Sequence, residues 1–137
     1  MKMVTLLLVL AFCLTFIGCG RIYGPVEEVK AFINEKDDVI LQMGKKIEAN
    51  PTEAGVDEAR KIFEVRKDGL KAKKEAIKAA PQGMKGDWLT LLYNSEGSDP
   101  KMLDAIRDIL IKAGAPTAAT DKFSALRKDF EATIKRY

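Results

Sequence analysis

Histidine is absent from the 137-residue chain, and its two cysteines are Cys13 and Cys19 near the N-terminus. The commonest proton carrier of enzymes near neutral pH is therefore missing. The chain after Cys19 has no thiol, which excludes a disulfide bond, a thiolate nucleophile and a cysteine-bound metal there. Serine-nucleophile motifs and GxxxxGK[ST] phosphate loops are also absent. We predict a protein that is not an enzyme, with no catalytic, metal-binding or cofactor-binding residues.

Acidic residues do not suggest a catalytic or metal site either. Neighbours in sequence, such as Asp37 and Asp38, point about 100° apart on a helix and do not converge. Asp104 and Asp108 share a helical face, but a hard cation prefers about six or more oxygen ligands. We interpret these carboxylates as solvated surface.

An excess of charge of one sign is also lacking. The net charge of the full chain is +3. Residues 1–18 contain one basic residue, Lys2, and no acid, so the remainder has 22 basic and 20 acidic residues. Nucleic-acid-binding proteins usually concentrate basic residues on one surface. We therefore do not expect a nucleic-acid partner.

The longest apolar run covers residues 3–17 and carries no charge. It is shorter than the roughly 20 residues that a transmembrane helix needs. Lys2 precedes the run and small residues follow it, which is typical of an export signal. We predict a signal peptide over residues 1–18, a short tether over 19–24 and a single helical domain over 25–137.

Residues 16–19 read Phe-Ile-Gly-Cys. Gly18 and Cys19 resemble the lipobox of bacterial lipoproteins, although Phe16 stands where that family prefers Leu. The resemblance implies that Cys19 is lipid-modified, with acyl chains such as palmitate, and becomes the mature N-terminus in the cell envelope. Gly20 is not Asp, which by the same resemblance favours the outer membrane, facing the periplasm. The expected membrane contact is thus the lipid on Cys19.

A competing interpretation is cleavage by ordinary signal peptidase. Gly18 and Gly20 would be the small residues that this peptidase reads, and the cut would precede Arg21. The product would be a soluble periplasmic or secreted helical inhibitor or effector. We favour the lipoprotein, because a lone cysteine that closes an apolar segment has little other purpose.

The proline positions predict where helices begin. Proline is tolerated in the first turn of a helix and disruptive inside one. Between residues 25 and 50, apolar residues recur at spacings of three, four or seven, as on one buried helical face. Asn50 and Pro51 are expected to open a second helix that runs to about Ala80. The five prolines are Pro25, Pro51, Pro81, Pro100 and Pro116.

The C-terminal part predicts two further helices. Asp99 and Pro100 are expected to open one that ends at Gly114, and the last is expected to start near Thr120. No alternating stretch is long enough for a strand. The predicted fold class is all-α, a small bundle of four to five helices after the signal peptide.

Residues 81–99 contain Trp88 and Tyr93 between glycine-containing stretches. One interpretation is a short helix that closes the open end of the bundle with large side chains. The other is an element that contacts a protein partner, since aromatic residues are common anchors in interfaces. Trp88 and Tyr93 are therefore candidate partner contacts.

The second helix is rich in lysine toward its end, including Lys71, Lys74 and Lys78. These side chains could contact anionic headgroups or an acidic partner. They could also be solvated surface placed where the helix dipole favours cations. With no motif for catalysis, we expect a non-enzymatic binding or accessory subunit with a protein partner in the envelope. The sequence does not predict the oligomeric state.

Overall fold

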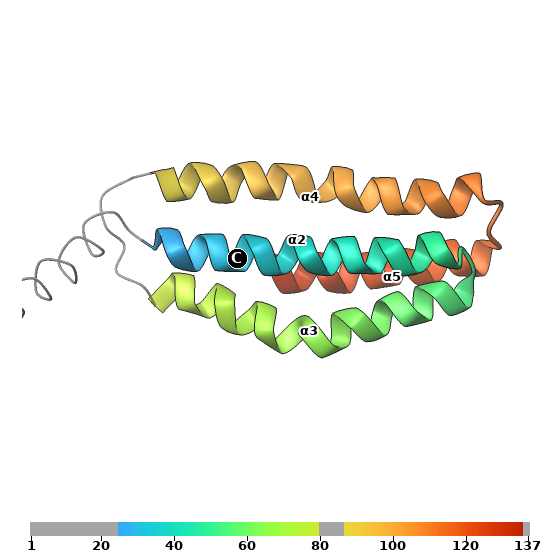
Figure 1. Ribbon diagram of the computed structural model, residues 1–137, viewed down its shortest axis with the longest axis horizontal. Coiled ribbons are helices and arrows are strands. Elements are labelled where there is room, and N and C mark those ends of the chain that lie inside the picture. Colours follow the sequence, from blue (N-terminus) through green and yellow to red (C-terminus); the bar gives the residue numbers. More distant parts are fainter. Residues whose placement is uncertain (1–24, 80–86, 136–137) are drawn as a thin grey trace, which may run out of the picture.

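The computed structural model describes residues 25–79 and 87–135, and this part of the chain consists of α-helices without a strand. The signal peptide, the tether, Cys19 and Pro81 lie outside the described residues. The predicted all-α bundle is confirmed for the described part (Figure 1). Its helices are α2 (Val26–Ala49), α3 (Glu53–Ala79), α4 (Asp87–Lys112) and α5 (Thr117–Ile134).

Each helix packs extensively against two others. α2 contacts α3 and α4, and α5 also contacts α3 and α4, with the α4–α5 contact the least extensive. α2 and α4 begin at the same end of the bundle, while α3 and α5 run in the opposite direction (Figure 1). α5 has 18 residues against 24 to 27 in the others, so it stops part-way along α2. None of the described helices combines the length and apolar character that crossing a membrane requires.

The core follows the helical spacing of apolar residues. Phe63 of α3 and Phe130 of α5 meet edge to face, with ring centroids 5.6 Å apart. On α2 the buried residues, with Lys36 among them, mostly recur every three or four positions, which places them on one face. Burying such faces between helices supplies the main stabilisation of the bundle. The fully buried apolar side chains of α2 and α4 include Val29, Val39, Ile40, Met43, Ile47, Leu103 and Leu110.

Several predicted helix ends are confirmed. Gly114 follows α4 with a φ of 67°, and the N–H of Ala115 donates to the carbonyl of Leu110, as in a Schellman motif. Pro25 and Pro116 immediately precede α2 and α5. The prediction that the last helix starts near Thr120 is wrong by three positions, because the carbonyl of Pro116 already accepts from Ala119 and α5 begins at Thr117. The prediction that Pro51 is the first residue of the second helix is wrong by two positions. The carbonyl of Thr52 accepts from Val56, so α3 begins at Glu53.

The prediction that Asp99 and Pro100 open a helix is wrong, because both lie inside α4. Proline removes one backbone donor from a helix and disfavours its continuation. The helix nevertheless continues, because Leu92 before the proline and Leu103 after it are both buried in the core. Asp99 also accepts a buried hydrogen bond from Lys36 of α2. Trp88 and Tyr93 accordingly belong to this long helix and not to a separate short one.

Candidate functional site

Lys36 occupies a core position of α2. It follows Phe32 by four residues and precedes Ile40 by four, and both neighbours are buried in the apolar core. Helical residues four apart lie on the same face, so an apolar residue is expected at position 36. Instead, an ammonium group is placed there, with only 1% of its side chain exposed. Lysine is almost never fully buried without a partner.

The partners of Lys36 come from α4. Its Nζ atom donates to Asp99 Oδ2 at 2.8 Å and also to the hydroxyl of Ser95. Nζ lies 5.9 Å from the centre of the Phe32 ring, within the range of a cation–π contact. Ser95 and Asp99 are four residues apart and therefore face α2 together.

One carboxylate oxygen of Asp99 lacks a hydrogen bond in the described part of the chain. Asp99 Oδ1 is buried and has no hydrogen-bond partner among the described residues. The side chain as a whole is 7% exposed. Burial raises the pKa of Asp99, while the hydrogen bond and the charge of Lys36 act in the opposite direction. A buried acceptor without a donor costs about 1–3 kcal/mol, so it needs an explanation in the molecule.

A pocket of about 460 Å³ lies beside this pair. It is bounded by α2, α4 and the end of α5, along the least extensive of the four helix contacts described above. Charged side chains from α4 and the end of α5 also line it, namely Glu96, Glu131 and Lys135. Its other lining residues are Phe32, Lys36, Asp99, Pro100, Ala132 and Ile134.

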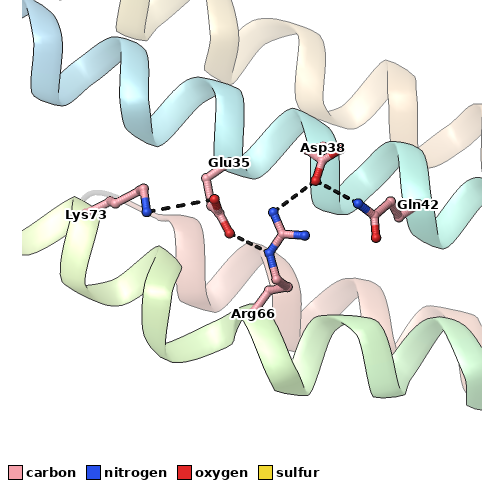
Figure 2. A network of polar contacts seen from close by, with 5 residues as sticks. All are labelled: Glu35, Asp38, Gln42, Arg66 and Lys73. Atoms are coloured by element: carbon pink, nitrogen blue, oxygen red, sulfur yellow. Dashed lines mark hydrogen bonds and ion pairs between the residues drawn. The ribbon is translucent and has the colours of Figure 1, made fainter.

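Glu35, the neighbour of Lys36 in sequence, points about 100° away from it around α2, toward α3. Figure 2 shows Glu35 and Asp38 reaching toward Arg66 on α3. Arg66 Nε lies 2.5 Å from Glu35 Oε1, and Arg66 Nη2 lies 2.9 Å from Asp38 Oδ2. Lys73 adds a longer contact to Glu35, and Gln42 donates to Asp38. The hydrogen bonds from Arg66 lower the pKa of both carboxyl groups. This network ties α2 to α3, whereas Lys36 ties α2 to α4.

The predicted aromatic contacts differ in exposure. Trp88 is 6% exposed and belongs to the core, and its indole N–H has no hydrogen-bond partner among the described residues. Tyr93 is 60% exposed. Both lie in the first two turns of α4, at the end of the bundle where α2 begins (Figure 1). Of the two, Tyr93 is the one whose side chain a partner could reach in this conformation.

The predicted basic contacts also have individual surroundings. Lys74 donates to the carbonyls of Thr133 and Lys135 and so stabilises the C-terminus of α5. Lys78 pairs with Glu75 at 3.0 Å, and Lys71 is exposed. These lysines lie on α3, at the same end of the bundle as Trp88 and Tyr93 on α4 (Figure 1). The two helices are not among the extensively packed pairs.

Lys36, Ser95 and Asp99 were not among the site residues predicted from the sequence. A signal was present, because the apolar stripe of the first helix lacks an apolar residue at position 36, three residues after Ile33 and four before Ile40, and so leaves a gap there. Lys36 fills that gap on the buried face. No group of three or more metal-binding side chains occurs in the described part of the chain. The cluster places a buried ion pair and an unpartnered acceptor behind the wall of the pocket.

Comparisons of the chain with protein-family models, with curated proteins and with solved structures find no match.

Proposed function

We propose that the protein is a non-enzymatic binding protein, held at the cell envelope by a lipid on Cys19, whose binding site is the pocket beside Lys36. The observation that carries the proposal is the buried Lys36–Asp99 pair at the wall of this pocket, with Asp99 Oδ1 unpartnered. Binding pockets are mostly apolar and contain a few fixed polar groups that orient the ligand. The pocket has this composition.

Stability alone does not account for the pair. Replacing a buried ion pair by apolar residues of similar size is often neutral or stabilising. Here the pair also leaves a carboxylate oxygen without a donor. A fold selected only for stability would gain from Met or Leu at these positions. We infer that the pair serves the pocket, whose wall it helps to form.

The number of residues between Cys19 and the helical domain is compatible with membrane anchoring. Pro25, the first described residue, follows Cys19 by six positions. Six residues span at most about 20 Å, so a lipid on Cys19 would keep the domain close to the membrane surface. The outer membrane facing the periplasm is the preferred location, and exposed Tyr93 is a candidate contact for a protein partner there.

Intact mass spectrometry of the protein isolated from bacterial membranes tests the anchor. We expect a mature chain that starts at Cys19 and carries a diacylglycerol-sized increment. Cys19→Ala should lose this increment and leave the membrane fraction. An unmodified chain that starts at Arg21 in the soluble fraction would replace the anchor with the secreted alternative, and it would leave the pocket untouched.

Native mass spectrometry of the same preparation tests the binding function. We expect wild-type protein to carry a non-covalent small molecule that the Lys36→Met/Asp99→Leu variant lacks. Val65→Ala is the control, because Val65 is 82% exposed and does not line the pocket. Equal retention by wild type and the double variant would contradict the proposed site.

A further inference from the structure

We infer that a second pocket, between α3 and the end of α5, binds a phosphate group through the ammonium groups of Lys67, Lys71 and Lys74. The same chemistry covers a soluble phosphate compound and the phosphate of a lipid headgroup. Apart from Ala132, this pocket shares no lining residue with the pocket beside Lys36. The inference therefore does not rest on the binding function proposed for that first pocket.

This second pocket, called the basic pocket from here on, has a volume of about 480 Å³. Its three lysines follow one another along α3 at spacings of four and three residues, so they lie on one face of that helix. The side chain of Lys67 is 29% exposed, so water screens its charge less than that of a fully exposed lysine. The other lining residues are Glu75 of α3 and Asp129, Ala132 and Thr133 of α5.

The two carboxylates in the lining are each paired with a cation outside it. Glu75 Oε1 lies 3.0 Å from Lys78 Nζ. Asp129 Oδ2 lies 2.9 Å from Arg60 Nη1. Neither carboxylate forms an ion pair with a lysine of the basic pocket in the described part of the chain. The three lysines therefore give this pocket an excess of positive charge.

The three ammonium groups also retain hydrogen-bond donors. Each has three N–H donors and no acceptor. Lys74 uses two of its donors on backbone carbonyls at the end of α5. Lys67 Nζ lies 3.8 Å from Glu64 Oε2, which is beyond hydrogen-bond distance. Lys71 is exposed and has no hydrogen bond or ion pair with a described residue.

A phosphate group complements this arrangement. Its oxygens are strong acceptors, and lysine commonly binds phosphate as a point charge. A tetrahedral phosphate can accept from several ammonium groups at once, whereas a carboxylate offers only two oxygens. Three lysines on one helical face beside a single pocket therefore favour phosphate among the common anions.

A lipid headgroup is within reach of the basic pocket. α3 ends at Ala79, at the end of the bundle where α2 begins (Figure 1). Lys71 precedes Ala79 by eight residues, which is about 12 Å along a helix. The proposed lipid on Cys19 would hold this end of the bundle near the membrane surface. Only the choice of a lipid as the source of the phosphate rests on the proposed anchor.

Inorganic phosphate is the probe for the site itself. The mature protein is kept at pH 7 in dodecyl maltoside, a detergent without charge or phosphate. Binding is followed by the methyl resonance of Thr133, because Thr133 lines the basic pocket and not the pocket beside Lys36. We expect a saturable shift with phosphate and none with chloride at the same ionic strength. A shift that does not saturate, or that chloride reproduces, would overturn the inference, because it would reflect only the screening of surface charge.

Charge substitutions at Lys71 test the role of the lysines. Lys71→Glu should weaken phosphate binding at least tenfold, which is about 1.4 kcal/mol, and Lys71→Gln should weaken it by a smaller factor. Circular dichroism should show an unchanged fold, because Lys71 is exposed. Lys101→Glu makes the same charge change at an exposed position of α4 outside both pockets and should bind like wild type. Equal affinities of Lys71→Glu and Lys101→Glu would overturn the inference.

Phosphatidylglycerol added to the micelles distinguishes the two sources of phosphate. A headgroup that occupies the basic pocket should shift the Thr133 resonance by itself and raise the apparent Kd for inorganic phosphate at least tenfold. An unchanged Kd assigns the site to a soluble phosphate compound, and both results support the phosphate site. A mature chain without lipid on Cys19 would remove the proposed anchor and leave the result with inorganic phosphate unchanged.

Discussion

A single ammonium group, that of Lys36, links the core of the bundle to its pocket. Its side chain is fully enclosed, and the oppositely charged partner comes from a different helix, 63 positions away in sequence. Removing one member of such a pair leaves an uncompensated buried charge, which is far costlier than removing both members. The energetic role of position 36 therefore depends on what remains at position 99.

Lys36→Met should lower the free energy of unfolding at pH 7 by about 3–5 kcal/mol, because Asp99 is then buried without its counter-charge. Burial raises the pKa of Asp99, so the folded variant takes up a proton more readily than the unfolded chain. The contribution of this group is thus favourable at low pH and is lost as the pH rises through its folded-state pKa. Urea unfolding at pH 7 and near pH 4 measures it, and the loss should be smaller at the lower pH. A loss that grows on acidification would contradict this account.

Glu35→Gln should show the opposite pH dependence. The hydrogen bond from Arg66 lowers the pKa of Glu35 below its ordinary value of 4.5. Its stabilisation is therefore present above that pH and disappears as the pH falls through the lower folded-state value. We expect a loss of about 0.5–1 kcal/mol at pH 7 and none near pH 2, measured by urea unfolding. Glu48→Gln, on an exposed part of α2, is the control and should have little effect at either pH.

At the residue scale, the sequence indicates which positions of the site are buried but not which residues pair with one another. Position 36 lies three residues after Ile33 and four before Ile40, a spacing that indicates burial. Ser95 and Asp99 continue the spacing between Leu92 and Leu103. Each polar residue alone is typical of a solvated face. Their pairing depends on α2 and α4 lying side by side with a common direction, which a helical period does not specify.

At the scale of elements, local sequence predicted the helices better than their boundaries. Gly114 ends α4 as expected, because glycine adopts a positive φ without strain. Pro100 was a misleading boundary, since the apolar face that spans it outweighs the missing backbone hydrogen bond. Tertiary packing therefore determines that α4 continues through Pro100.

Two glycines of α3, Gly55 in its first turn and Gly69 in its middle, give a matched pair of substitutions. A Cβ atom at Gly55 would overlap the carbonyl oxygen of Asn50, whereas one at Gly69 would meet nothing within 4 Å. Gly55→Ala should therefore destabilise the bundle by about 1–3 kcal/mol through overpacking against the backbone. Gly69→Ala should stabilise it by about 0.5–1 kcal/mol, because alanine favours the helix. Thermal unfolding by circular dichroism measures both, and equal effects would contradict the close approach of Gly55 to Asn50.

At the scale of the whole molecule, the four described helices enclose one core, and α5 is too short to complete it along its full length. The pocket lies where α5 ends, so the site follows from helix length as much as from individual residues. The all-α class was predictable from periodicity, but the order of neighbours around the bundle was not. That order brings Lys36 to Asp99.

The central claim is that the Lys36–Asp99 pair serves the pocket and not the fold. The most direct measurement is the free energy of unfolding of Lys36→Met/Asp99→Leu in the absence of ligand, compared with wild type by urea denaturation at pH 7. We expect a double variant that is at least as stable as wild type, since both buried charges and the unpaired oxygen are removed together. A loss of about 3 kcal/mol or more, as large as that expected for Lys36→Met alone, would show that the fold itself requires the pair and would contradict the claim.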